Sequence, residues 1–269
     1  MTEAARTMFF IVPAFNEAGN ATTLVGGFRA LDAELRQLSL TPHFIIVDDG
    51  SSDDTVKAFT AASVGLPLEI LSHGRNRGPG MAFATGFTHL QGRIGDGDWL
   101  VTMEGDNTSR HELISQMLTR TREGYDLVLA SPYMYGGTVI NTAFIRTFLS
   151  YCANIFMREL LELRGILTMS SFFRLYRGAT VRHLQATYGA GIIERPGFDC
   201  MVELLMKAVF LSVRLSEVPM VLDTSRRVGK SKMKVMRAIY DLLTLTFQKA
   251  RWKAMARQAP GRASVSRAG

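Results

Sequence analysis

The chain has 269 residues, of which 47% are hydrophobic and 20% are charged, so it can bury a sizeable core in one large domain. Two cysteines cannot form a disulfide framework, which favours a reducing, cytoplasmic compartment. The short polar start indicates no signal peptide, and no uninterrupted apolar run is long enough to span a bilayer.

The net charge of +7 is concentrated at the end of the chain. Residues 224–269 hold twelve Lys or Arg and one acid, whereas the rest holds nineteen basic and 23 acidic residues. A basic segment of this kind suits phosphates, a membrane surface or nucleic acid, or it is simply a solvated tail. We expect no nucleic-acid partner, because no stacking-aromatic motif or recognised nucleic-acid-binding pattern is present.

The first half of the chain alternates short apolar runs with amphipathic stretches. Strands are expected at 8–13, 44–47, 68–71 and 99–103, and helices at 21–38, from 55 onward and at 81–90, with Pro42 closing the first helix. Such alternation predicts an α/β fold with a mostly parallel, Rossmann-like sheet and helices on both of its faces.

The second half predicts strands at 126–130, 172–177 and 213–218 and helices at 144–163, 200–209 and 232–257. The last helix has one apolar face flanked by Lys and Arg. That face either rests on anionic lipid headgroups or packs on the core, and both are possible together. We therefore divide the chain into a main domain (1–230), a basic amphipathic helix (231–257) and a disordered tail (258–269).

Three of the predicted strands end in acidic loops. These loops are Asn16-Glu17, Asp48-Asp49 and Glu104-Gly-Asp106, and the carboxyl ends of parallel strands form the usual ligand edge of such a sheet. Glu104 and Asp106 can face one point, since alternate residues of a strand point the same way, and Gly105 leaves room for a ligand. Two such carboxylates suit Mg²⁺ or Mn²⁺ completed by substrate phosphates; the alternative is an ordinary polar loop. No Gly-x-Gly-x-x-Gly follows the first strand, so a dinucleotide site is not predicted.

Together these motifs resemble family 2 glycosyltransferases. The resemblance rests on Ile11-Val-Pro-Ala-Phe-Asn-Glu17, Val47-Asp-Asp-Gly-Ser-Ser-Asp-Asp-Thr55, Arg75-Asn-Arg-Gly-Pro-Gly-Met-Ala82 and Glu104-Gly-Asp106. Glu217-Val-Pro219 and Arg226-Arg-Val-Gly-Lys-Ser-Lys-Met233 resemble the dolichol-phosphate mannosyltransferase branch, and the similarity covers about residues 8–240. It implies a GT-A fold, a GDP- or UDP-sugar donor, a Mg²⁺ or Mn²⁺ ion, inversion at the anomeric carbon and a polyprenyl phosphate acceptor.

The resemblance also implies roles for individual residues. Glu104 and Asp106 would hold the metal and the diphosphate, with Gly105 between them. Asp48 would accept hydrogen bonds from the base; it and Asp49 are donor-site candidates, unless they only form a turn or cap a helix. The remaining implied positions are a nucleoside pocket of Pro13, Phe15 and Glu17 and two phosphate-binding cations, Arg226 and Lys232.

Four sites depart from the family pattern. Glu104 replaces an aspartate, Thr108 a glutamine and Pro132 a phosphate-binding arginine. At the fourth site Thr168 replaces an aspartate that is a candidate catalytic residue in relatives, and Phe172 replaces a glycine.

The missing aspartate bears on the acceptor. A phosphate monoester has a second pKa of about 6, so it is a nucleophile near neutral pH without a general base. Arg174, Arg226 and Lys232 would then position it. A hydroxyl acceptor needs a base, for which Asp199 or Glu203 is the substitute we would name. A catalytically degenerate nucleotide-sugar-binding protein is the third alternative. A basic helix on the membrane would place the enzyme peripherally, at the cytoplasmic face.

Overall fold

A seven-stranded sheet forms the centre of the protein in the computed structural model, which describes residues 6–142, 155, 158–161, 163, 165–226 and 235–259. The strand order is β3-β2-β1-β4-β7-β5-β8. Neighbouring strands are parallel except at β7, which is antiparallel to both β4 and β5. The strands are β1 (Arg6–Ala14), β2 (Leu40–Asp48), β3 (Leu68–Ser72), β4 (Trp99–Thr102), β5 (Leu127–Ser131), β7 (Arg174–Arg177) and β8 (Leu215–Pro219). A separate parallel pair joins β6 (Thr138–Ile140) to β9 (Val221–Asp223).

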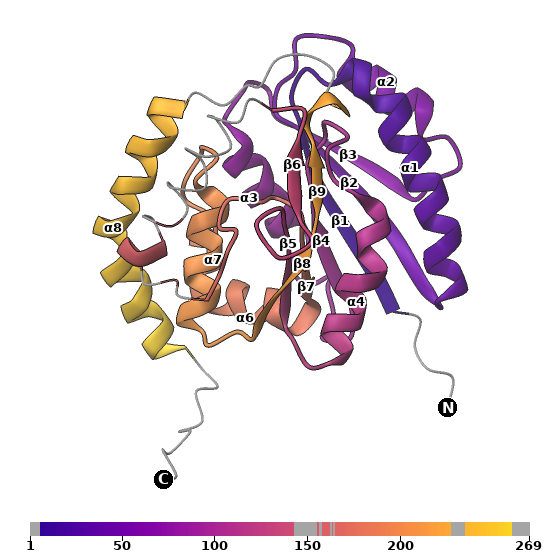
Figure 1. Ribbon diagram of the computed structural model, residues 1–269. Helices are drawn as coiled ribbons and strands as arrows, with labels where there is room; N and C mark the ends of the chain where they lie inside the picture. Colours follow the sequence, from indigo (N-terminus) through magenta and orange to yellow (C-terminus); the bar gives the residue numbers. More distant parts are fainter. Residues whose placement is uncertain are drawn as a thin grey trace.

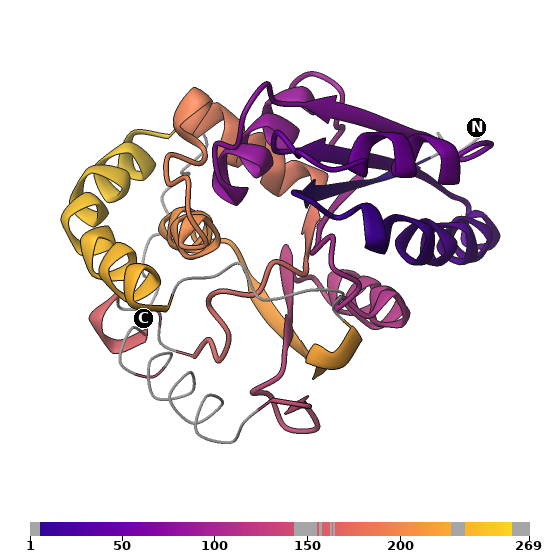
Figure 2. The ribbon, with the colours of Figure 1, turned by 90° about the horizontal axis from the view of Figure 1, so that it is seen from above.

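Helices cover both faces of the sheet (Figures 1 and 2). One core cluster contains residues of α1 (Ala18–Gln37), α2 (Thr55–Ala62) and α4 (Ile114–Arg122). The other contains residues of α3 (Pro79–His89), α6 (Gly178–Tyr188), α7 (Cys200–Phe210) and α8 (Val235–Gln258). Short 3₁₀ turns η1 (His111–Leu113), η2 (Gly189–Gly191) and η3 (Thr224–Arg226) complete the described elements. The predicted α/β fold with a mostly parallel sheet is confirmed.

The sequence of β1 accounts for its central place. Phe9 and Ile11 belong to the core cluster that contains α3, whereas Phe10 and Val12 belong to the cluster that contains α1. All four side chains are buried. A strand with helices on both faces needs apolar residues at every position, which is the continuous run that the sequence has.

Several predicted elements differ from the structure. Pro42 lies inside β2 and does not end a helix; it is opposite Met8 of β1, whereas pairing with β3 begins only at Phe44. A proline is tolerated there because that part of β2 has a partner strand on one side only. No prediction was made for α4, α6, β6 or β9. The helix predicted at 144–163 falls mainly outside the described residues.

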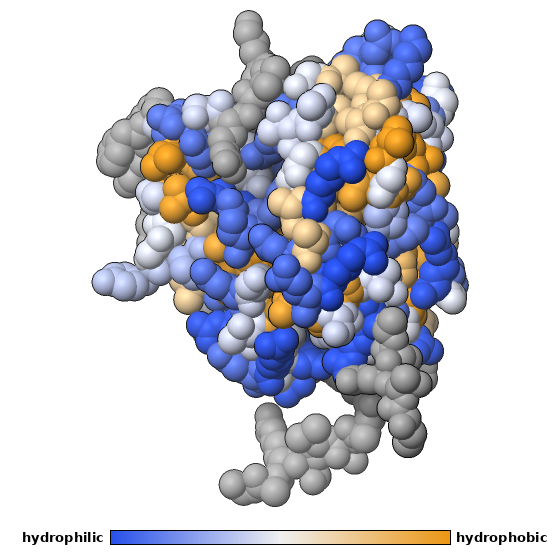
Figure 3. All heavy atoms as spheres, turned by 90° about the vertical axis from the view of Figure 1, so that its right-hand side faces the viewer, coloured by the Kyte–Doolittle hydropathy of each residue, from blue (hydrophilic) through white to orange (hydrophobic). Residues whose placement is uncertain are grey.

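The face that carries α1 and α2 is mostly hydrophilic, with smaller apolar areas between the polar side chains (Figure 3). Exposed apolar residues on or beside these helices are Leu38, Val56 and Val64. Among the described residues, no helix has the length and apolar character needed to cross a membrane.

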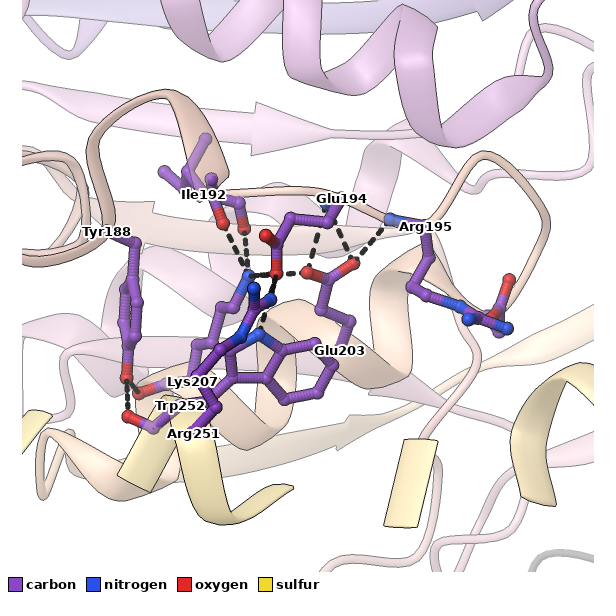
Figure 4. Close-up of polar contacts among 10 residues, drawn as sticks. Tyr188, Ile192, Glu194, Arg195, Glu203, Lys207, Arg251 and Trp252 are labelled. Atoms are coloured by element: carbon purple, nitrogen blue, oxygen red, sulfur yellow. Dashed lines mark hydrogen bonds and ion pairs between the residues drawn. The ribbon is translucent and has the colours of Figure 1, made fainter. Parts of the chain in front are cut away.

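A buried ion pair lies at the contact between α7 and α8 (Figure 4). Glu203 and Lys207 are both fully buried and bond to each other. The carboxylate also accepts the backbone N–H groups of Glu194, at 3.0 Å, and Arg195, at 2.8 Å. Burial raises the pKa of Glu203 and lowers that of Lys207. Because each charge would be costly to bury alone, the two groups depend on each other.

The same lysine fixes α8 to the rest of the protein. Lys207 Nζ lies 4.6 Å from the centre of the Trp252 ring, a cation–π contact. Trp252 is fully buried, and its Nε1 donates to Glu194 Oε2 at 2.7 Å. Leu245 and Ala256 of α8 are buried in the same cluster. The described part of the C-terminal helix is therefore packed on the core, one of the two arrangements that the sequence allowed.

We expect Trp252→Ala to lower the free energy of unfolding by about 3–5 kcal/mol, because it empties a fully buried aromatic site and removes the contact with Lys207. Trp252→Phe, which keeps most of the buried ring, should cost less. Urea denaturation measures both. Lys253→Ala, at the exposed neighbouring position, is the control and should change stability by no more than about 0.5 kcal/mol. Equal effects of Trp252→Ala and Lys253→Ala would contradict this role.

Candidate donor and metal site

The loops that follow β1 and β2 are joined by hydrogen bonds. The backbone N–H of Asn16 donates to Ser51 Oγ at 2.9 Å, and that of Ser52 donates to Asn16 Oδ1 at 2.9 Å. The N–H of Glu17 donates to Thr55 Oγ1 at 2.8 Å. The two loops predicted to form a nucleoside pocket are therefore held together by their short polar side chains.

The loop that follows β4 joins the same network. Asn107 Nδ2 donates to Asn20 Oδ1 at 2.9 Å, and Asn20 Nδ2 donates to the carboxylate of Glu17. Sequence analysis missed both asparagines. Asn107 adjoins the acidic pair, but its partner is 87 residues away, and only the fold brings the two together.

The carboxyl ends of β1 and β4 meet at Gly105. A Cβ atom built there would lie 2.7 Å from the carbonyl oxygen of Pro13. That distance is below any normal contact, and the obstacle is backbone that cannot rotate away. Pro13, near the end of β1, and Phe15, just after it, are both half-buried. Glycine at 105 therefore lets the acidic loop lie directly against the predicted nucleoside pocket.

The two acids of that loop are held in different ways. Glu104 is half-buried; its Oε2 accepts the hydroxyl of Ser109, and its Oε1 accepts the backbone N–H of Phe172 at 3.3 Å. Asp106 Oδ1 accepts from Thr108, at 3.2 Å from the amide and 2.5 Å from the hydroxyl. Thr108, at the position of the family's glutamine, therefore orients Asp106.

These two carboxylates fit a divalent cation. Burial, and next the negative charge of Asp106, raise the pKa of Glu104, so the pair carries a repulsion that a bound cation would relieve. Among the described residues, no group of three or more His, Cys, Asp or Glu side chains could hold a metal. Two carboxylates with the remaining ligands from phosphates and water is the arrangement that Mg²⁺ prefers.

Asp48 ends β2 and Asp49 follows it, but the two have different surroundings. Asp48 Oδ1 accepts the amide of Ser51 at 3.1 Å, and this residue stays a candidate for the base. Asp49 Oδ1 accepts from His73 Nδ1 at 2.8 Å and from the amide of Arg77 at 2.9 Å.

The second oxygen of Asp49 is also used, because Oδ2 accepts the amide of Gly78 at 2.8 Å. Asp49 thus ties the end of β2 to the glycine-rich loop before α3. Both oxygens of Asp49 are occupied by the protein and the residue is 2% exposed, which favours the turn-forming alternative; donor binding by Asp49 stays a prediction.

Arg174 does not take the role that the sequence suggested. Its guanidinium is fully buried and donates to three carbonyl oxygens: Ser171 and Met201 at 2.8 Å and Met169 at 2.6 Å. A buried group directed at backbone carbonyls cannot position an acceptor phosphate, so that prediction is wrong.

The two substitute bases are also engaged. Glu203 is the buried partner of Lys207, so its catalytic assignment is wrong. Asp199 is nearly buried, and its Oδ2 accepts from Arg195 Nε at 2.5 Å, which gives it a structural partner in place of a catalytic one. Both carboxylates fix the start of α7.

The two predicted phosphate-binding cations lie at the edge of the described chain. The turn η3 ends at Arg226, and Lys232 lies outside the described residues, so the phosphate contacts of both stay predictions.

We expect Gly105→Ala to weaken Mn²⁺-dependent binding of UDP or GDP by at least tenfold, because the added methyl must push the acidic loop away from Pro13. Calorimetric titration would measure this. Gly97→Ala is the matched control, since nothing lies within 4 Å of a Cβ at that position. Similar nucleotide affinity in the two variants would contradict the required close approach.

A family model described as "Glycosyl transferase family 2" matches residues 9–184. Among characterised proteins, the chain is 28% identical to polyprenol monophosphomannose synthase of Mycolicibacterium smegmatis, over 83% of this chain and 79% of that protein. It is 28% identical to undecaprenyl-phosphate mannosyltransferase of Micrococcus luteus, over 83% and 86%. It is 27% identical to dolichol-phosphate mannosyltransferase of Pyrococcus furiosus, over 90% of this chain but only 63% of that longer protein.

Solved structures share the fold at low identity. Mannosyl-3-phosphoglycerate synthase from Rubrobacter xylanophilus aligns with a TM-score of 0.61 at 16% identity, over 97% of this chain and 78% of that one. Glucosyl-3-phosphoglycerate synthase from Mycobacterium tuberculosis, in complex with Mn²⁺, UDP and phosphoglyceric acid, aligns with a TM-score of 0.59 at 18% identity, over 96% and 81%. The family match spans the strands and loops that build the site described above, and the chain belongs to glycosyl transferase family 2.

Proposed function

We propose that this protein is a metal-dependent, inverting glycosyltransferase that moves a sugar from a GDP- or UDP-sugar to a polyprenyl phosphate. The observation that carries the proposal is the Glu104–Asp106 pair, held at the end of β4 against the loops that follow β1 and β2. The relatives named above, which are polyprenyl-phosphate mannosyltransferases by name, support the acceptor class.

On the donor side, Pro13 and Phe15 flank the nucleoside and Asp48 accepts from its base. Glu104 and Asp106 would hold Mg²⁺ or Mn²⁺ together with the diphosphate. When bound, the cation would neutralise the negative charge that develops on the departing nucleoside diphosphate. The chain's own part is to fix both carboxylates in place before the donor arrives, through Ser109, Phe172 and Thr108.

On the acceptor side, a phosphate oxygen attacks the anomeric carbon as the bond to the diphosphate breaks. No proton has to be removed from a phosphate dianion. A mechanism without a general base agrees with the presence of Thr168, because a threonine hydroxyl is not a base. That hydroxyl lies 2.5 Å from Ser131 Oγ. Such a mechanism also agrees with the structural partners of Asp199 and Glu203, which weaken the case for a hydroxyl acceptor. Arg226 and Lys232 are the proposed phosphate-binding cations.

A polyprenyl acceptor lies in a membrane, so we also propose peripheral association through α8, at the cytoplasmic face. Phe247 is 86% exposed on this helix, and Lys253 and Arg257 are exposed as well. A helix that exposes both an apolar side chain and cations suits the headgroup region of an anionic membrane.

We expect release of UDP or GDP from a donor sugar only when Mn²⁺ or Mg²⁺ and a short-chain polyprenyl phosphate are both present. The measurement screens UDP- and GDP-sugars for nucleoside diphosphate release with this acceptor and with the corresponding polyprenol. Transfer to a hydroxyl acceptor but not to the phosphate would overturn the acceptor class. Absence of donor binding under every condition would favour a degenerate protein.

The variant Asp106→Ala tests the metal site. It should abolish metal-dependent donor binding while leaving the fold intact, because Asp106 is half-exposed in a loop. Unchanged donor affinity with Mn²⁺ would remove the acidic pair from the mechanism.

We expect the double variant Phe247→Glu/Lys253→Glu to reduce binding to vesicles containing phosphatidylglycerol, since it places negative charge on the proposed contact face. Turnover with a water-soluble, short-chain polyprenyl phosphate should not change. Sedimentation with vesicles measures the binding, and Lys57→Glu, exposed on α2, is the matched control. Equal vesicle binding by the wild-type protein, the double variant and Lys57→Glu would contradict membrane contact through this face of α8.

A further inference from the structure

The segment 167–173, just before β7, lies behind one of the two candidate metal ligands. The backbone N–H of Phe172 donates to Glu104 Oε1 at 3.3 Å, and the carbonyl of Phe172 accepts the hydroxyl of Thr102 at 2.7 Å. This segment thus touches both the last residue of β4 and the first acid of the loop after it. The position of the Phe172 amide therefore affects the orientation of Glu104.

A half-buried carboxylate from another strand holds the start of this segment. Glu217 of β8 accepts the N–H of Leu167 at 2.8 Å through Oε2 and that of Thr168 at 2.9 Å through Oε1. Glu217 pairs in the sheet with Leu129 of β5, so it reaches the segment from the far edge of the sheet. Thr168 is fixed further by its hydroxyl contact with Ser131, the last residue of β5.

Arg174 holds the other end of the segment. Two of its three carbonyl contacts are to Met169 and Ser171, within the segment, and the third is to Met201 of α7. The carboxylate of Glu217 thus accepts the segment's N–H groups while the guanidinium of Arg174 binds its carbonyls. Partial burial raises the pKa of the Glu217 carboxyl, because the half-buried charge has lost part of its contact with water. The cost of burying these charges is offset by bonds that fix one short segment.

We propose that Glu217 is a positioning residue for the metal site: it fixes the segment 167–173 so that the Phe172 amide orients Glu104. This inference rests on the proposed function, because it requires Glu104 to bind the cation. Glu217 itself touches neither metal nor substrate. At position 168, where relatives carry an aspartate, this chain has a threonine, whose backbone N–H donates to Glu217. Hydrogen-bond partners of metal ligands typically change metal affinity about 10–100-fold when they are mutated.

The test is the affinity for Mn²⁺ in the presence of UDP or GDP, measured from the electron paramagnetic resonance signal of free Mn²⁺. We expect Glu217→Gln to weaken Mn²⁺ binding by about tenfold, since a glutamine amide can accept only one of the two N–H bonds well. Glu217→Asp, which keeps the charge but has a shorter side chain, should also weaken Mn²⁺ binding. This second variant replaces Glu217→Gln in the test if the glutamine form does not fold.

Glu203→Gln is the matched control. Glu203 also accepts two backbone N–H groups, but it bonds to the residues before α7 and not to segment 167–173. Both glutamine variants should lose stability to urea, and only Glu217→Gln should lose Mn²⁺ affinity. Equal losses of Mn²⁺ affinity in the two would show a general structural effect and overturn the proposal.

A double variant tests whether Glu217 acts through Glu104. In a Glu104→Gln background, Glu217→Gln should cause little further loss of Mn²⁺ affinity, whereas independent effects would add. Wild-type Mn²⁺ affinity in a folded Glu217→Gln or Glu217→Asp protein would refute the positioning role alone. Failure of the wild-type protein to bind Mn²⁺ with either nucleotide would instead refute the proposed function.

Discussion

The site depends on the close approach of two backbones at Gly105. The end of β4 passes so near the end of β1 that no side chain fits between Gly105 and the carbonyl of Pro13. Because of this contact, the pair of acids that follows the fourth strand lies beside the loop that follows the first. Hydrogen bonds from Asn107 through Asn20 to Glu17 then hold the two loops together. In the proposed function, a metal held by the acids would lie next to a nucleotide whose phosphates would complete its ligand shell.

Charged groups in the interior determine much of the remaining architecture. Arg174 and Glu217 fix the segment behind Glu104, and Glu203 with Lys207 fixes the start of α7 and the docking of α8. In each case the charge binds backbone groups or an opposite charge, which offsets the cost of removing it from water. For this reason, charged residues such as Arg174 and Glu203, which the sequence suggested as catalytic candidates, have structural partners in the fold.

The chemistry of the acceptor follows from what these residues can do. Thr168 stands where relatives have an acid, and Asp199 and Glu203 are paired with cations of the protein. A phosphate acceptor needs no general base, which agrees with the polyprenyl-phosphate acceptors in the names of the relatives. In the proposed function, the main tasks of the chain would be to bind a donor and to orient a metal.

Sequence alone determined the fold class, seven of the strands along the chain and the acidic loops, because short apolar runs and the polar residues that end them are local signals. It also predicted Glu104 and Asp106 as a metal site from such a loop, and Asp48 as a donor-site residue from the family resemblance. Tertiary structure alone decided which charges face a ligand and which face the core: Asp49 and Arg174 look equally functional in the sequence, yet both are buried against backbone groups. Their hydrogen-bond partners lie up to 29 residues away in the sequence, and one partner of Glu217 lies 50 residues away. Contacts at such separations exist only once the sheet has formed.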